Sequence, residues 1–220
     1  MINKVIIFGI NDFAELAHFY LTIDSKYSVV AFSVHSEYMP EKKVFRGLPV
    51  VPFETVDNEF NPEQFLFFSP MAPIKMNEIR KKVYVQIKEK GYKFISYVSS
   101  KATTFGNKIG DNCFILENNT IQPFTEIGNN VVLWSGNHIG HHGRIEDHVS
   151  FTSHVVMSGH CNIKENCFLG VNSTIRDGIT LAKGTLVAMD ASITKNTEEW
   201  GVYVGIPAKK KEGLKSYDVM

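Results

Sequence analysis

Six of the eight histidines of the chain lie in one short stretch, residues 137–160. Imidazole is both a common zinc ligand and the side chain best suited to acid–base chemistry near neutral pH. The stretch therefore predicts one of three things: a metal site, an acid–base centre, or a structural repeat in which histidine has no chemical role. The residues around the histidines bear on this choice because they follow a strict period.

An apolar residue recurs at every sixth position from Ile109 to Ile193, fifteen times in succession. A small residue usually lies four positions after it. This hexapeptide period is typical of a parallel β-helix, in which three hexads make one triangular coil and fifteen make five coils. All three cysteines, Cys113, Cys161 and Cys167, fall at the small position, so we expect them to be buried packing residues rather than reactive thiols.

The period also predicts which histidines can meet. Residues 18 positions apart should lie in adjacent coils, about 4.8 Å from each other. His142, His148, His154 and His160 share one position of the hexad, but only His142 and His160 are one coil apart. We expect those two to stack, and His148 and His154 to be surface residues on other faces. This divergence argues against zinc, which requires three or four converging ligands, so no metal is expected.

His141 lies outside that hexad position, and the residue one coil above it is Gly159. Glycine lets a ligand or another group approach the backbone closely. A histidine beside an exposed backbone N–H can supply a general base and an oxyanion donor, which acyl transfer requires. On the register alone, this chemical role and a purely structural one are equally compatible with the pair.

The first hundred residues follow a different pattern, in which strands alternate with helices. Strand, helix, strand in this order predicts a small parallel sheet with helices on its faces. The fold class is therefore α/β followed by β: a Rossmann-like domain at residues 1–100, the β-helix at 101–200, and a C-terminal strand and tail at 201–220. The expected strands are 4–10, 28–34, 65–70 and 92–98, and the expected helices are 11–21 and 76–91.

The turn after the first strand, Gly9–Ala14, lies where a dinucleotide fingerprint would be. Its middle glycine is replaced by Asn11, and the second strand ends without an acidic residue to hold a ribose. A nicotinamide cofactor is therefore not expected. The turn is either part of another nucleotide site or an ordinary connection from strand to helix, with Asn11 or Asp12 as the helix cap.

The composition excludes several classes of protein. Lys plus Arg and Asp plus Glu are 23 each, so the formal net charge is zero and no nucleic-acid partner is indicated. No apolar run is long enough for a transmembrane helix, and the short apolar run near the N-terminus indicates a strand rather than a signal peptide. Three cysteines do not form a disulfide framework. We expect a cytoplasmic protein without membrane insertion.

Three segments, "NHIGHHGRI", "NCFLGVNSTIRDGI" and "GVYVGIPAKK", resemble a known family. It is the family of bacterial sugar acyltransferases with a left-handed parallel β-helix, often called the sialic acid O-acetyltransferase family, which includes UDP-4-amino-sugar N-acetyltransferases. The segment "MNEIRKKVYVQIKEKGYKFISYV" is similar to the end of that family's nucleotide-sugar domain. The left-handedness comes from this resemblance alone, since the general preference of crossovers is right-handed.

The resemblance implies a homotrimer, with acyl-CoA lying along the β-helix between subunits and a nucleotide sugar held by the N-terminal domain. His141 matches the general base, and Gly159 matches the glycine whose amide faces the thioester oxygen. The residues implied for CoA are Ser158, Gly170, Val171, Asn172, Gly205, Pro207, Ala208 and Lys209. Those implied for the sugar substrate are Gly9, Ile10, Asn11, Phe13, His35, Ser69, Trp134 and His138.

The chain departs from the family at two positions. The family commonly has Asp or Glu directly after the base, where this chain has His142. The group that orients His141 is then His142 itself, a carboxylate such as Glu146 or Asp147, or a neighbouring subunit. Trp134 replaces a small polar residue, and either reshapes the acceptor pocket or caps the edge of a coil.

Three functions follow as expectations. The first is an acetyl-CoA- or other acyl-CoA-dependent transferase that acts on the amine or hydroxyl of a nucleotide-linked, amino-deoxy sugar for surface glycan biosynthesis. The second is a metal-dependent lyase or hydrolase of the gamma-carbonic-anhydrase type, with ligands among His138, His141 and His142. The third is a binding protein without catalysis.

Overall fold

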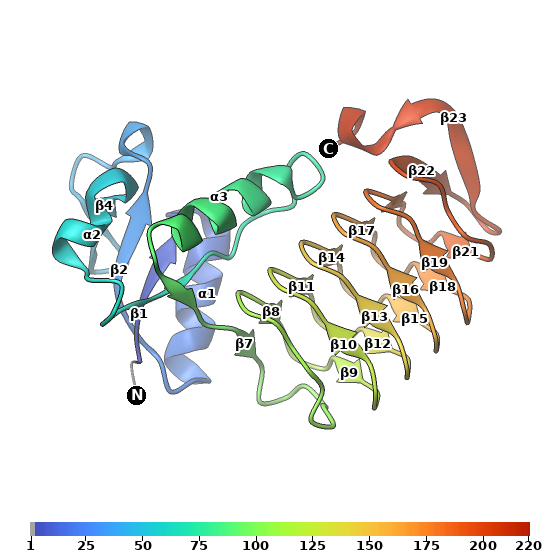
Figure 1. The fold of residues 1–220 in the computed structure, drawn as a ribbon, viewed down its shortest axis with the longest axis horizontal. Coiled ribbons are helices and arrows are strands. Elements are labelled where there is room, and N and C mark those ends of the chain that lie inside the picture. Colours follow the sequence, from blue (N-terminus) through green and yellow to red (C-terminus); the bar gives the residue numbers. More distant parts are fainter. Residues whose placement is uncertain (1–2) are drawn as a thin grey trace. The chain divides into compact units, whose positions relative to one another are not determined.

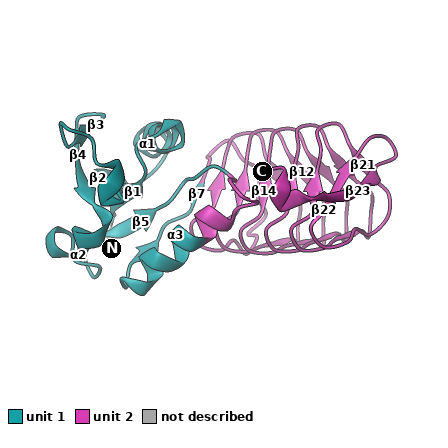
Figure 2. Cartoon of the chain, turned by 90° about the horizontal axis from the view of Figure 1, so that it is seen from above, with its two compact units in different colours: residues 1–72, 82–97 teal, residues 73–81, 98–220 magenta. Residues whose placement is uncertain are grey.

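The computed structural model describes residues 3–220, and the chain divides into two compact units (Figures 1 and 2). The first unit takes in the chain up to Ala72 together with residues 82–97. The second unit consists of residues 73–81 and 98–220. Among the described residues, no helix has both the length and the apolar character needed to cross a bilayer.

The first unit is built on a six-stranded sheet with the strand order β3-β4-β2-β1-β5-β6. Its neighbouring strands are parallel except for β3, which pairs antiparallel with β4. The sequence missed β3 and β4, because the two prolines of β4 argue against a strand. The strands are β1 (Lys4–Phe8), β2 (Ser28–Val34), β3 (Val44–Phe45), β4 (Leu48–Pro52), β5 (Leu66–Phe68) and β6 (Lys93–Phe94).

The helices of the N-terminal half agree with the sequence pattern. Asn11 caps α1 (Asp12–Ile23), and its side chain accepts a hydrogen bond of 3.2 Å from the Ala14 N–H. The helix α3 (Glu78–Glu89) falls within the predicted range, and a short helix, α2 (Val56–Glu59), was not predicted. Three 3-10 turns complete the set: η1 (Ser36–Tyr38), η2 (Phe53–Thr55) and η3 (Ser216–Asp218).

The single strand expected at residues 92–98 is two strands. β6 adds to the sheet of the first unit, whereas β7 (Tyr97–Val98) is the first strand of an eight-stranded sheet in the β-helix. One apolar run therefore serves both sheets, and periodicity alone could not show where it breaks.

The second unit is a parallel β-helix of three sheets (Figure 1). From β8 (Phe114–Ile115) to β18 (Thr174–Ile175), each strand pairs with the strand 18 residues later. Leu133 thus lies against Phe151 and Ile139 against Met157, as the hexad register predicts. The apolar hexad residues fill the interior, and the three cysteines are fully buried among them.

The three sheets differ in length. The eight-stranded sheet contains β7, β8 (Phe114–Ile115), β11 (Val132–Leu133), β14 (Ser150–Phe151), β17 (Phe168–Leu169), β20 (Leu186–Val187), β22 (Gly201–Val204) and the antiparallel β23 (Lys209–Lys215). The five-stranded sheet contains β9 (Thr120–Ile121), β12 (His138–Ile139), β15 (Val156–Met157), β18 (Thr174–Ile175) and β21 (Ser192–Ile193). The four-stranded sheet contains β10 (Glu126–Ile127), β13 (Arg144–Ile145), β16 (Asn162–Ile163) and β19 (Thr180–Leu181).

Turns between these sheets form three corners. The histidine corner joins the five-stranded to the four-stranded sheet and consists of residues 122–125, 140–143, 158–161 and 176–179. The docking corner joins the four-stranded to the eight-stranded sheet through residues 128–131, 146–149 and 164–167. The third corner returns to the five-stranded sheet through residues 134–137, 152–155, 170–173 and 188–191.

The histidines recur because of the backbone at these corners. The hexad position three after the apolar residue is left-handed, with φ of +53° at His142, +62° at His148, +60° at His154 and +56° at His160. Asparagine, aspartate, histidine and glycine tolerate this conformation better than other residues. The same position also holds Asn112, Asn118, Asn130, Asn166, Asn172 and Asp190. Four of the six clustered histidines thus occupy a position that the turn itself constrains.

Residues 73–81, which the sequence placed in the domain at 1–100, pack on the docking corner. The Asn77 Oδ1 atom accepts a hydrogen bond of 2.7 Å from the Ser150 hydroxyl. Arg80 is fully buried, and its Nη2 atom donates to the Val149 carbonyl at 3.2 Å. These buried polar contacts explain why the segment groups with the β-helix.

His148 lies at the docking corner and is only 6% exposed, so the expectation of a surface residue is wrong. Its Nδ1 atom lies 2.9 Å from the Asn130 side-chain amide. Burial, followed by the positive charges of Lys81 and Arg80, lowers the pKa of His148 to about 4. The left-handed position was visible in the sequence, but the segment that covers this corner was not.

This lowered pKa predicts an acid-sensitive stability. The unfolded chain, with a histidine pKa of about 6.5, binds a proton between pH ~6.5 and ~4 that the folded chain does not. This contribution to the free energy of unfolding should be fully present above pH ~6.5. It should decrease by about 2–3 kcal/mol as the pH falls from ~6.5 to ~4. Denaturant unfolding at a series of pH values measures this loss.

His148→Asn is the matched variant, because asparagine suits the left-handed turn and retains a polar side chain beside Asn130. The difference in unfolding free energy between wild type and variant should change with pH between about 6.5 and 4 and be constant above. Parallel pH profiles for the two proteins would contradict the assignment.

Candidate active site

The His141 imidazole lies directly over the backbone of Gly159, one coil above it. A Cβ atom at position 159 would be 2.8 Å from the His141 Cε1 atom and 3.0 Å from its Nε2 atom. Only glycine therefore leaves room for the ring in this orientation. The structure confirms that these two residues are neighbours, and it directs Nε2 to the space beside Gly159.

The other ring nitrogen of His141 faces His142, with 3.1 Å between the two Nδ1 atoms. One of these nitrogens donates and the other accepts, depending on which carries the proton. Of the groups considered for orienting His141, His142 is thus the one in contact. Glu146 and Asp147 lie at the docking corner, where Lys164 and Asn129 respectively bind them.

Further contacts hold this histidine pair. The His141 N–H donates to the Gln122 Oε1 atom at 3.1 Å. The His142 ring stacks on His160 with 5.2 Å between centroids and 17° between planes, as the register predicts. On its other side the ring contacts Phe124 at 4.7 Å. Both rings of the pair are therefore restrained, although both residues are exposed.

Gly159 is buried, and its N–H has no partner within the coil stack. Among residues 3–220, no group accepts a hydrogen bond from it. Gly140 lies below, and a Cβ atom there would be 2.6 Å from the Gly159 nitrogen. Two glycines in adjacent coils thus keep the space around this amide clear, and sequence reasoning had noted only Gly159.

Asp177 is a second group that the sequence analysis missed. Its Oδ1 atom lies 3.0 Å from the position that a Gly159 Cβ would take, so the carboxylate and the imidazole flank the same small space. Asp177 occupies the hexad position of His141 two coils later. The 18-residue register therefore indicates its corner, two coils from His141.

The residues predicted to hold CoA gather mainly at the third corner. Gly170 is required there, because a Cβ atom would lie 2.5 Å from the Met189 nitrogen of the next coil. The segment after β22 lies beside Ser192, which donates to the Gly205 carbonyl at 3.0 Å and accepts from the Ala208 N–H at 2.8 Å. Val171, Asn172, Pro207 and Lys209 lie in these two segments, whereas Ser158 lies at the histidine corner.

Two predicted acceptor-binding residues lie apart from His141. Trp134 is half-buried at the third corner, where its carbonyl accepts a hydrogen bond of 2.9 Å from Asn119. His138 is exposed on β12. Within one chain, Trp134 therefore lies at the edge of a coil. For Trp134 to contact an acceptor bound at His141, the two residues would have to belong to different copies of the chain.

Sequence and structure comparisons agree on the fold. Residues 108–141 match the family model described as bacterial transferase hexapeptide (six repeats). Residues 162–195 match the one described as hexapeptide repeat of succinyl-transferase. A mutant of the perosamine N-acetyltransferase from Caulobacter crescentus, solved with CoA and GDP-perosamine, superposes with a TM-score of 0.84 at 18% identity, covering 96% of this chain and 98% of that one.

Two further solved structures are similar over nearly their whole length. The acetyltransferase domain of PglB from Neisseria gonorrhoeae FA1090, in complex with acetyl coenzyme A, has a TM-score of 0.83 at 18% identity, covering 95% of this chain and 99% of that one. WeeI from Acinetobacter baumannii AYE has a TM-score of 0.79 at 16% identity, with 94% and 99% covered. The chain has the hexapeptide-repeat β-helix fold of these solved structures. This confirms the predicted left-handed β-helix with an α/β domain before it.

In this fold, the predicted N-terminal substrate residues lie at the carboxyl edge of the first unit's sheet. Gly9 follows β1, His35 follows β2 and Ser69 follows β5. The chain leaves β1 on one side for β2 and on the other for β5, so the edge includes a topological switch point, where ligands of open α/β sheets bind. Ile10 and Phe13 are half-buried beside it, and Ser69 is 2% exposed.

Glu54 is a further residue at this edge that the sequence did not indicate. Its carboxylate accepts from the Ser36 hydroxyl at 2.6 Å and lies 2.9 Å from the His35 Nδ1 atom. The Ser36 hydrogen bond, followed by that of His35, lowers the pKa of Glu54 to about 2. An acidic side chain therefore lies at the end of β2, and it is Glu54 from η2 that supplies it. A hollow of about 500 Å³ is lined by His35, Phe53, Glu54, Gln86, Glu89 and Lys90.

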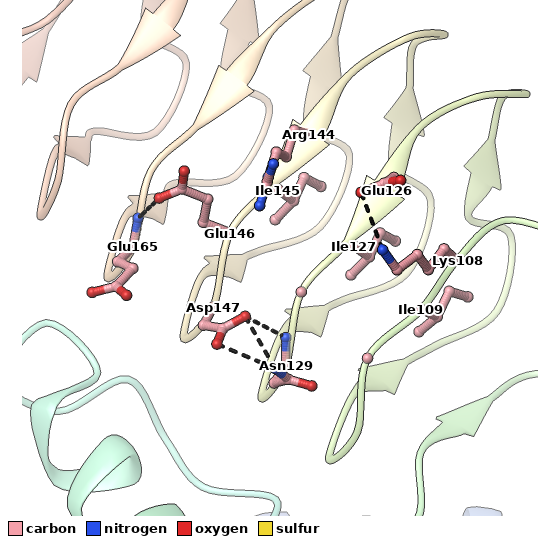
Figure 3. Close-up of a pocket in the computed structure, with 12 residues that line it drawn as sticks. Lys108, Ile109, Glu126, Ile127, Asn129, Arg144, Ile145, Glu146, Asp147 and Glu165 are labelled. Carbon is pink, nitrogen blue, oxygen red and sulfur yellow. Dashed lines mark hydrogen bonds and ion pairs between the residues drawn. The ribbon is translucent and has the colours of Figure 1, made fainter.

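The β-helix has a second hollow, of about 490 Å³, on the four-stranded sheet and the docking corner (Figure 3). Several of its charged side chains already have partners within the β-helix. Lys108 lies 3.7 Å from Glu126, and Asp147 accepts from the Asn129 N–H at 2.7 Å. Glu146 and Asp147, two candidates for orienting His141, line this hollow, but they do not contact His141, and the hollow carries no functional assignment.

Proposed function

We propose that this protein is an acyl-CoA-dependent acyltransferase that acetylates an amine or hydroxyl of a nucleotide-linked amino-deoxy sugar. The observation that carries this proposal is the His141 Nε2 atom beside the open Gly159 N–H. These two groups can remove a proton from the acceptor and stabilise the oxyanion. Solved structures of the same fold include N-acetyltransferases with CoA, acetyl coenzyme A or GDP-perosamine bound.

The proposed step is direct transfer. When His141 carries its proton on Nδ1, this N–H donates a hydrogen bond to the His142 Nδ1 atom. The Nε2 lone pair of His141 is then free to act as a base. The acceptor nitrogen or oxygen attacks the thioester carbonyl while Nε2 takes its proton. The Gly159 N–H donates to the oxyanion as it forms. The C–S bond then breaks, and the departing CoA thiolate takes up the proton from His141.

A homotrimer with sites between subunits supports this step. Within one chain, the predicted CoA segments lie at the third corner and His141 at the histidine corner. A single CoA molecule must contact both the predicted CoA segments and His141. It is best accommodated where the third corner of one subunit meets the histidine corner of another. Acetyl-CoA or another acyl-CoA is then the co-substrate.

The nucleotide of the acceptor is assigned to the carboxyl edge of the first unit's sheet. The switch point and the hollow beside His35 and Glu54 support this assignment. Such an enzyme would act in the cytoplasm, where nucleotide sugars and acyl-CoA are available, and would supply an acylated sugar for surface glycan biosynthesis.

The metal-dependent lyase or hydrolase has less support. Its proposed ligand set included His138, but the convergent histidines are His141, His142 and His160. Two of the solved structures reported above, from Caulobacter crescentus and Neisseria gonorrhoeae, are acetyltransferases rather than lyases. The binding protein without catalysis leaves the open amide beside His141 unexplained.

An acceptor screen tests the proposal. The purified protein is incubated with acetyl-CoA and each of a panel of nucleotide-linked amino sugars, and thiol release is followed. We expect release to depend on one acceptor class and the product to carry one additional acetyl group by mass spectrometry. Thiol release that no amino sugar or sugar hydroxyl stimulates would contradict the proposal.

A further inference from the structure

Three histidines at the histidine corner could hold one metal ion together. His141, His142 and His160 each offer a ring nitrogen, and these nitrogens all lie within 4.8 Å of one another. All three side chains are exposed, so a hydrated cation can reach them. We call these residues the histidine triad.

Part of the triad already has the spacing of a chelate. The Nδ1 atoms of His141 and His142 are 3.1 Å apart. Zinc–nitrogen bonds of about 2.0–2.1 Å at tetrahedral angles place two ligand nitrogens about 3.3 Å apart. Two neutral imidazoles at this distance share one proton at most, and a cation that accepts both lone pairs satisfies both nitrogens at once.

His160 is placed to be the third ligand. Its ring lies 5.1 Å from His141 and 5.2 Å from His142 between centroids. Because it is nearly parallel to His142, it must rotate out of the stack to direct a nitrogen at the shared cation. The ring is exposed, and among the described residues no group forms a hydrogen bond with it, so rotation breaks only the stacking on His142.

We propose that the histidine triad binds a divalent d-block cation such as Zn²⁺, and that the bound cation inhibits the enzyme. Imidazole nitrogens suit Zn²⁺, Ni²⁺, Co²⁺ and Cu²⁺, whereas Mg²⁺ and Ca²⁺ prefer oxygen. A cation on the His141 Nδ1 atom forces the proton of that neutral ring onto Nε2. The lone pair that faces Gly159 is then lost, and the ring cannot accept a proton from the acceptor.

The triad differs from a cofactor site because the cation blocks the base instead of assisting it. Metal binding is a property of three side chains and does not depend on the proposed function. Only the inhibition rests on that function, so the two can fail separately.

The decisive variant is His160→Asn, with His154→Asn as the matched control. Both histidines are exposed and occupy the left-handed position, with φ of +56° and +60°, but His154 lies at the third corner. Asparagine suits this backbone, so both variants should fold. Neither residue takes or gives a proton in the proposed transfer step, and the Nδ1–Nδ1 contact that orients His141 involves neither of them.

The experiment titrates chelator-treated protein with Zn²⁺ in competition with a chromogenic zinc indicator, and repeats it with Co²⁺, followed by its visible absorption. We expect one ion per chain for wild type and His154→Asn. Loss of one ligand should weaken binding at least as much as loss of an outer-shell partner, about 10–100-fold, in His160→Asn. Equal affinity in all three proteins, or no stoichiometric binding to wild type, would overturn the site.

Transfer assays complete the test. Zn²⁺ at the concentration that saturates the wild-type triad should abolish thiol release, and EDTA should restore it. His160→Asn should keep its rate at that concentration. Full wild-type activity with the triad saturated would overturn the inhibition, whereas binding that depends on His160 without any transferase activity would count against the proposed function alone.

Discussion

Replacement of His141 by asparagine is expected to lower kcat for acyl transfer by about 10²–10⁴-fold, the usual contribution of a positioned general base. Asparagine cannot accept a proton from the acceptor, and it removes the nitrogen that faces Gly159. The residue is exposed in a turn, so the free energy of unfolding should change by only about 0.5 kcal/mol or less. Steady-state kinetics with saturating acceptor and acetyl-CoA measures the effect.

The control for this variant is His160→Asn, which changes the same residue type at the same corner. It should retain a rate close to that of wild type when no metal ion is present. If His141→Asn transferred the acyl group at the full rate, then the assignment of the base would be wrong. A comparable loss in His160→Asn would show that the corner, rather than one nitrogen, supports the reaction.

The sequence predicted the β-helix because its signal is periodic and local. Each apolar hexad residue meets its counterpart 18 positions away, so one period determines the core, the register and the stacking of His142 on His160. The pairing of His141 with Gly159 followed from the same arithmetic. Where side chains interact through the repeat, the sequence was sufficient.

The sequence failed where contacts come from outside the repeat. His148 has the same hexad position and backbone as His154, yet one is buried and the other exposed. The difference arises because residues 73–81 pack on the docking corner and on the adjoining eight-stranded sheet, next to His148. In the first unit, Glu54 reaches His35 from another element, and no spacing along the chain indicates that contact.

The orientation of His141 shows the same limit. The register could not show that the two Nδ1 atoms of adjacent histidines would face each other. Side-chain rotation decides that contact, and the period of the backbone does not encode it. Asp177 was within reach of the register, since it follows Gly159 by one coil.

Gly159→Ala should lower kcat about 10²-fold, the scale of loss that a displacement of about 1 Å can cause. The new methyl group would lie 2.8 Å from the His141 Cε1 atom and 3.0 Å from the Asp177 Oδ1 atom, so the imidazole must rotate away. Both obstructing groups are ends of exposed side chains that can move at little cost to folding. We therefore expect a large loss of activity with a small change in Tm.

Gly178→Ala provides the opposite result at the same corner. A Cβ atom there meets nothing within 4 Å, but the backbone has a φ of +71°, which is unfavourable for alanine. This variant should lose about 1–2 kcal/mol of stability and keep its kcat. Comparison of Gly159→Ala with Gly178→Ala thus separates a steric effect on His141 from the effect of backbone strain. If Gly159→Ala also lost stability and kept its rate, then the space beside that amide would serve packing, and the oxyanion role would have to be assigned elsewhere.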